Sequence, residues 1–89
     1  MEITLKGKVA LVTGGGAGIG KAVVEAYGDL GARIAVAEID AGKVDALNAG
    51  FAKAGIDGIA IQADVQKTED VNRVIAEVDR KFGRLDVLV

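Results

Sequence analysis

The sequence contains no cysteine and no histidine. Without cysteine the chain forms neither disulfides nor thiolate metal sites, and this composition fits a reducing compartment. Histidine is the commonest metal ligand and the commonest general base at neutral pH, so its absence removes both roles. We therefore expect no metal site and a cytoplasmic location.

Aromatic residues and clusters of basic residues are also scarce. Tyr27, Phe51 and Phe82 are the only aromatics, and the net charge is -2 with no basic run. We therefore do not expect aromatic surfaces on which nucleic-acid bases could stack, nor positively charged patches that bind their phosphates. No apolar run is long enough to cross a bilayer, and the first residues lack the shape of a signal peptide. We expect an intracellular, soluble protein that binds neither nucleic acid nor a membrane.

What the sequence does have is a regular alternation of apolar runs and amphipathic stretches. The 89 residues, 51% of them hydrophobic, suffice for one small domain, residues 1–89. Apolar runs at 9–13, 33–37, 59–63 and 85–89 predict strands, and amphipathic stretches between them predict helices. This alternation with short connections predicts an α/β fold: a Rossmann-like parallel sheet of order 3-2-1-4 with crossover helices, the N-terminal half of a doubly wound fold.

The expected helices carry recognisable ends. Asp40 and Thr68 are placed to cap the second and third helices, and Gly31 and Gly83 to end the first and third. Gly50 interrupts the second helical pattern and weakens that prediction. The third helix is expected to pack one apolar face on the sheet, formed by Val71, Val74, Ile75, Val78 and Phe82.

The segment from Val9 to Gly20 combines a buried strand, a glycine cluster and the start of a helix. Its pattern is Thr13-Gly14-x-x-x-Gly18-Ile19-Gly20. Glycines let the backbone turn tightly and let a ligand approach, and the N–H groups of the following helix attract a phosphate. The alternative is a tight turn without a ligand, but the strand–turn–helix context favours a pyrophosphate site.

This motif resembles the cofactor motif of the short-chain dehydrogenase/reductase family. The opening residues 5–12 are also similar to the usual start of that family, and the resemblance extends from about Leu5 to Val89. It implies that backbone amides of the turn hold the phosphates of a dinucleotide cofactor. The residues so implied are Gly14, Gly16, Ala17, Gly18 and Ile19.

Glu38 follows the second strand about 20 residues after the glycine turn, where an acidic side chain accepts hydrogen bonds from a ribose. A carboxylate there repels the 2′-phosphate of NADP. Ala17 and Ile39 occupy positions that are often basic in relatives preferring NADP, so we expect the cofactor to be NAD. Lys21 and Arg33 are nearby basic residues that could soften this preference. The alternative for Glu38 is a solvated charge at a strand end.

Asp64 and Val65 match an Asp-Val pair of the family. The resemblance implies that Asp64 accepts from the adenine amino group and that Val65 covers the edge of the ring. Without the resemblance, an aspartate after a strand is more often an ordinary turn or cap residue.

No residue here is expected to be catalytic. In the family, hydride transfer depends on a serine and a Tyr-x-x-x-Lys segment that come later, whereas this chain has no serine and Tyr27 is followed four residues on by Gly31. We expect a truncated NAD-binding domain, without dehydrogenase activity alone, from an oxidoreductase acting on an alcohol or carbonyl. The alternatives are a non-catalytic dinucleotide-binding module and a structural fragment that self-associates through the exposed edge of its last strand.

Overall fold

The computed structural model describes residues 3–89, so Met1 and Glu2 lie outside the described residues. Four parallel strands form one sheet in the order β3-β2-β1-β4. They are β1 (Val9–Thr13), β2 (Arg33–Glu38), β3 (Gly58–Gln62) and β4 (Val87–Leu88). The expected α/β fold and strand order are confirmed.

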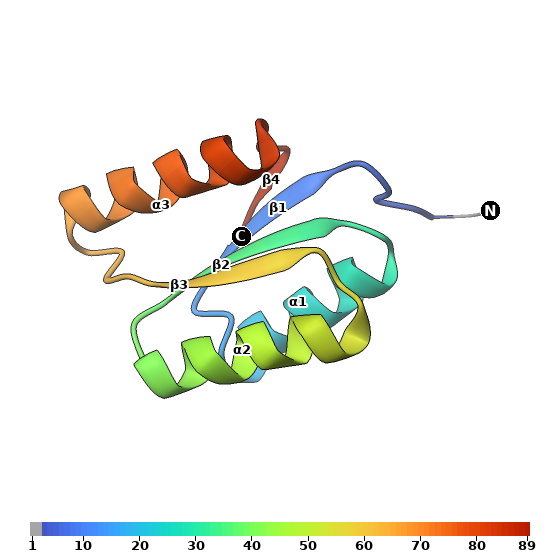
Figure 1. Cartoon of the computed structure of the whole chain (residues 1–89), viewed down its shortest axis with the longest axis horizontal. Coiled ribbons are helices and arrows are strands. Elements are labelled where there is room, and N and C mark those ends of the chain that lie inside the picture. The colour runs from blue at the N-terminus through green and yellow to red at the C-terminus, as the bar shows by residue number, and fades with distance from the viewer. Residues whose placement is uncertain (1–2) are drawn as a thin grey trace.

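Three helices cross between consecutive strands: α1 (Gly18–Asp29), α2 (Ala41–Ala54) and α3 (Thr68–Phe82). Figure 1 shows α1 and α2 on one face of the sheet and α3 on the other. None of these helices in residues 3–89 has the length and apolar character needed to span a membrane.

The strands are mostly apolar because both of their faces are covered. Val9 and Leu11 of β1 belong to the core under α3, whereas Val12 belongs to the core under α1 and α2. On the α3 side the core also contains Ala35, Ala37, Ile61, Ala63, Val74, Val78 and Phe82, and on the other side Val24, Ala32, Ile34, Val36, Val44, Phe51 and Ala60.

Two features of α3 differ from expectation. The prediction that Thr68 caps this helix was wrong: the N-cap is Lys67, and no side chain caps it, because the turn before the helix closes with Lys67 N–H donating to the Asp64 carbonyl. The predicted apolar face was too wide, since Val71 and Ile75 are 37% and 44% exposed. The residues that do pack, Val74, Val78 and Phe82, recur every four positions.

The capping of α2 agrees with expectation, because the Asp40 carboxylate accepts from Lys43 N–H at 3.1 Å. The same helix also covers the outer edge of the sheet. Asn48 donates to the Ala60 carbonyl at 3.1 Å and accepts from Ala60 N–H at 2.9 Å. It thereby satisfies backbone groups of edge strand β3 that would otherwise be open to another strand.

Asp86 links the segment just before β4 to the first residue of β1. Its carboxylate accepts from the Val9 N–H at 2.9 Å and from the Arg84 guanidinium at 2.9 and 2.7 Å. The Arg84 hydrogen bonds first, and the Val9 N–H second, lower the pKa of Asp86 to about 2. Asp86 therefore joins the start of β1 to the segment that leads into β4.

Asp86→Asn is expected to lower the melting temperature at pH 7. A depressed folded pKa contributes stability above the unfolded value, about 3.9, and that contribution is lost as pH falls through the folded value of about 2. The difference in melting temperature between wild type and variant should thus be full above pH 4 and nearly vanish at pH 2. Thermal unfolding followed by circular dichroism measures it, with the exposed Asp29→Asn as control. A difference that does not change between pH 7 and pH 2 would contradict this account.

Candidate functional site

The carboxyl ends of the parallel strands bring the predicted site residues to one edge of the sheet. In the register, Thr13 lies beside Ala37, and Glu38 lies beside Gln62. The glycine turn follows β1 directly, Glu38 is the last residue of β2, and Asp64-Val65 begins two residues after the end of β3. In open α/β sheets this edge is where ligands bind.

Backbone contacts with β2 and within the loop hold the glycine turn in place. Gly14 N–H donates to the Ala37 carbonyl at 2.8 Å, which fastens the turn to β2. Gly14 and Gly18 have φ of 67° and 60°, a conformation that favours glycine. At Gly20 a methyl group would overlap the Gly14 carbonyl oxygen and lie 2.9 Å from its carbon. The first turn of α1 therefore packs against the loop at a distance that only glycine allows.

The beginning of α1 presents backbone donors without partners. Its N-cap is Ala17, which has no capping side chain, and its first turn has no acidic residue. Within residues 3–89, no acceptor is found for the N–H groups of Gly18, Ile19 and Gly20. Such a bare helix N-terminus is suited to an anion. Among the other implied residues, the N–H groups of Gly14 and Gly16 already have acceptors in the protein.

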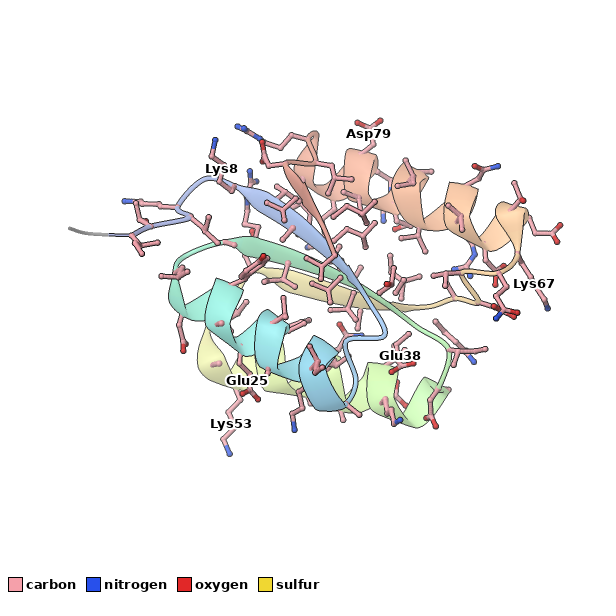
Figure 2. All side chains as sticks on the ribbon, turned by 180° about the vertical axis from the view of Figure 1, so that it is seen from behind. Lys8, Glu25, Glu38, Lys53, Lys67 and Asp79 are labelled. Atoms are coloured by element: carbon pink, nitrogen blue, oxygen red, sulfur yellow. The ribbon has the colours of Figure 1, made fainter. Side chains whose placement is uncertain are left out.

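Glu38 is buried, with only 7% of its surface exposed. Its Oε1 accepts from Gly16 N–H at 3.2 Å, and its Oε2 accepts from the N–H groups of Ile39 and Asp40 at 2.7 and 3.4 Å. Figure 2 shows this side chain between the beginnings of α1 and α2. A carboxylate has about four acceptor sites, so three N–H bonds leave room for a further donor such as a hydroxyl group. Glu38 is not the solvated charge that was the alternative.

Three of the implied residues are large apolar side chains that solvent reaches. Ile19, Ile39 and Val65 are 86%, 61% and 48% exposed. Each follows the carboxyl end of a different strand, so together they surround the same edge. They provide apolar surface for an aromatic ring beside the polar turn.

Asp64 has the role of a turn residue in this structure. Its Oδ1 accepts from Gln66 N–H at 2.9 Å, and its own N–H donates to Asp70 Oδ2 at 2.9 Å. This is the ordinary alternative considered for an aspartate at a strand end, and it leaves Oδ2 available. The part of Asp64 in holding adenine stays a prediction.

Lys43 lies against the glycine turn, which the sequence argument did not predict. Its side chain lies against Gly16, so that a methyl group there would stand 2.8 Å from Lys43 Cβ and 2.9 Å from Lys43 Cδ. The available signal was its position three residues after the N-cap Asp40, in the first turn of the helix that follows Glu38.

Tyr27 packs against the core under α1 and α2. Within residues 3–89, no group of three or more acidic side chains could hold a metal ion.

Comparisons with known proteins agree with this arrangement. The short chain dehydrogenase family matches residues 8–89. Peroxisomal 2,4-dienoyl-CoA reductase of Arabidopsis thaliana is 39% identical over 85 residues, covering 96% of this chain and 28% of that protein. Cis-1,2-dihydrobenzene-1,2-diol dehydrogenase of Pseudomonas putida is 42% identical over 87 residues, covering 96% and 30%.

A solved short chain dehydrogenase/reductase of Burkholderia phymatum, in complex with NAD, superimposes with a TM-score of 0.91 at 29% identity. The match covers 98% of this chain and 31% of that one. The chain thus spans about a third of the length of the relatives it matches. With the family pattern running through 82 of its 89 residues, from 8 to 89, the chain belongs to the short-chain dehydrogenase family.

Proposed function

We propose that this chain binds NAD at the carboxyl edge of its sheet. The observation that carries the proposal is the bare N-terminus of α1 behind the glycine turn, directly across from the buried Glu38 carboxylate. Backbone donors suit the pyrophosphate, and a carboxylate with spare acceptor capacity suits the ribose hydroxyls. The fit therefore covers the adenosine diphosphate part of the cofactor.

The other implied residues complete this placement. The pyrophosphate lies against the segment from Gly16 to Ile19, and adenine lies between Ile39 and Val65 with its amino group directed at Asp64. Because Glu38 repels a 2′-phosphate and neither Ala17 nor Ile39 is basic, NAD is preferred over NADP.

The parent activity that we propose is hydride transfer between NAD and an alcohol or carbonyl. Bound nicotinamide supplies the hydride chemistry, while this chain holds the cofactor and orients it. Proton transfer to or from the substrate oxygen needs a further acid–base group. Since the chain has no serine and no Tyr-x-x-x-Lys, we propose that residues 1–89 alone show no dehydrogenase activity.

Calorimetric titration of the chain with NAD, ADP-ribose and NADP tests the cofactor proposal. We expect binding of NAD and ADP-ribose with similar affinity, and binding of NADP weaker by about tenfold or more. Circular dichroism under the same conditions reports whether the chain is folded. A folded chain that gives no heat with NAD or ADP-ribose would mean that the glycine turn is empty.

A second candidate function is a dinucleotide-binding module without chemistry. What favours it is that all the site residues implied for this chain are assigned to the adenosine diphosphate half of the cofactor and none to the nicotinamide half. The two functions are distinguished by the coding sequence after Val89: a continuing Tyr-x-x-x-Lys segment supports the enzyme, and its absence supports the module.

We further propose that the chain self-associates along β4. Asn48 occupies the Ala60 backbone groups at the outer edge of β3. Within residues 3–89, by contrast, β4 pairs only with β1, and Leu88 and the following Val89 are 67% and 46% exposed. An unprotected edge beside apolar side chains pairs readily with another chain. Sedimentation equilibrium is expected to show a dimer or larger species that Leu88→Lys reduces. A monomer at all concentrations up to the solubility limit would exclude this pairing.

For location we propose the cytoplasm, on the cysteine-free composition. Imaging a fluorescent fusion of the complete gene product tests this, and exclusive signal in an organelle would overturn it.

A further inference from the structure

The connection from α2 to β3 contains the dipeptide Asp57-Gly58, and no other aspartate in the sequence is followed by glycine. Figure 1 shows this connection at the end of the sheet where the strands begin, away from the candidate cofactor site. Phe51 explains the glycine, because a methyl group at position 58 would lie 2.9 Å from a carbon of its ring. The packing of α2 on β3 therefore leaves the Gly58 nitrogen without a Cβ of its own residue to shield it.

The Gly58 N–H points away from the sheet. Gly58 pairs with Ile34 in the register of β2 and β3, and the Asp57 carbonyl accepts from Ile34 N–H at 3.1 Å. Because a trans peptide is planar, with C=O and N–H on opposite sides, the Gly58 N–H faces the outer edge of β3. Asn48, which covers that edge, bonds to Ala60 instead, and within residues 3–89 no acceptor is found for the Gly58 N–H. The nitrogen is therefore not committed to a hydrogen bond.

The Asp57 carboxyl group is free to reach this nitrogen. Its side chain is 61% exposed, and its ion pair with Lys81 is long, with 3.9 Å between Oδ1 and Nζ. An exposed pair of this length is too weak to hold the side chain in one rotamer. The backbone restraint is the hydrogen bond from Ile34 N–H, which lies at the first pair of the β2–β3 register, where a strand end opens at low cost.

We propose that Asp57-Gly58 is a site of spontaneous backbone modification, at which aspartate converts to isoaspartate through a cyclic imide. The Gly58 nitrogen forms a bond to Asp57 Cγ, and one carboxyl oxygen leaves as water with the amide proton and the carboxyl proton. Water then breaks the bond from the nitrogen either to Cγ, which restores aspartate, or to the main-chain carbonyl carbon, which gives isoaspartate. The net reaction is an isomerisation that consumes nothing, and the two reacting groups are held together by the chain itself.

The conversion changes the backbone but not the charge. Isoaspartate adds a methylene group to the main chain before β3, so the carbonyl that accepts from Ile34 N–H is displaced. The start of β3 should then detach from β2. Aged wild-type protein should melt at a lower temperature than fresh protein, whereas aged Asp57→Glu should not, because the larger ring that glutamate requires closes poorly. Equal losses in both proteins would contradict this consequence.

The test incubates the folded chain and a synthetic peptide of residues 54–67 in the same neutral buffer, with circular dichroism to confirm the fold. Trypsin releases the same peptide from the chain, since it lies between Lys53 and Lys67. Electron-transfer fragmentation in a mass spectrometer distinguishes the two isomers, which have equal mass. We expect isoaspartate at position 57 to form in the folded chain within about tenfold of its rate in the peptide. A slower rate would show that the fold protects this bond, and would overturn the proposal.

Asp64 is the matched internal control, because it lies in the same peptide but is followed by the β-branched Val65. It should remain aspartate while position 57 converts. Asp57→Glu should yield no isomer at position 57. If isoaspartate forms equally at positions 57 and 64, the reaction does not depend on the open Gly58 nitrogen, and the assignment of this site is wrong.

Discussion

Replacing Gly20 with alanine is expected to reduce NAD affinity by about tenfold to a hundredfold. The added methyl group would overlap the Gly14 carbonyl oxygen and approach the Gly15 Cα to 3.1 Å. Both contacts are backbone, so the first turn of α1 must move away from the loop. That movement displaces the N–H groups of Gly18 and Ile19, on which phosphate binding depends. Overpacking of this kind also costs about 1–3 kcal/mol of unfolding free energy. Titration with NAD and urea denaturation measure the two effects.

Gly50→Ala is the matched control for this substitution. Gly50 lies inside α2, and a methyl group there would meet nothing within 4 Å. Because alanine is the better helix former, the variant should be more stable by about 0.5–1 kcal/mol. Its NAD affinity should not change. Equal NAD binding by both variants would show that the close approach at Gly20 has no bearing on the cofactor.

The fold was predictable because its determinants are local. The apolar run of β1 is buried on both faces, as expected, and Asp40 caps α2 through the hydrogen bond that its position predicts. Errors arose where tertiary packing decides the outcome. β3 begins at Gly58, one residue before the expected start, where glycine lies under the Phe51 ring. β4 covers only Val87–Leu88 of the predicted strand 85–89, although backbone hydrogen bonds to β1 continue to Val89.

For the candidate site, the sequence predicts which residues lie near one another, but not which hydrogen bonds they make. The glycine pattern and the strand ends placed Glu38 beside the turn. Its burial, and its bond to Gly16 N–H across 22 positions, depend on the rotamer it takes after α2 has docked. The position of Lys43 against Gly16 likewise requires two helices to be packed side by side. Spacing along one chain contains no signal for such a contact.

Glu38→Ala is expected to lower both NAD affinity and stability. The substitution leaves the N–H groups of Gly16, Ile39 and Asp40 without their acceptor, and an unsatisfied buried donor costs about 1–3 kcal/mol. Because Ile39 and Asp40 are exposed and water replaces part of the loss, we expect a total of about 2 kcal/mol. Loss of the ribose acceptor should weaken NAD by about tenfold or more, since hydrogen bonds to charged groups are worth about 1.5–3 kcal/mol.

Glu38→Gln and Asp79→Ala separate these causes. Glutamine retains one acceptor oxygen, so it should recover much of the stability while still binding NAD less tightly than wild type. Asp79→Ala removes the same charge from α3, on the opposite face of the sheet, where Figure 2 shows it pointing away from the site. It should leave NAD affinity unchanged. If Asp79→Ala weakens NAD as much as Glu38→Ala does, net charge is responsible. If Glu38→Ala binds NAD as tightly as wild type while remaining folded, the carboxylate serves only to close the glycine turn, and the ribose has another partner.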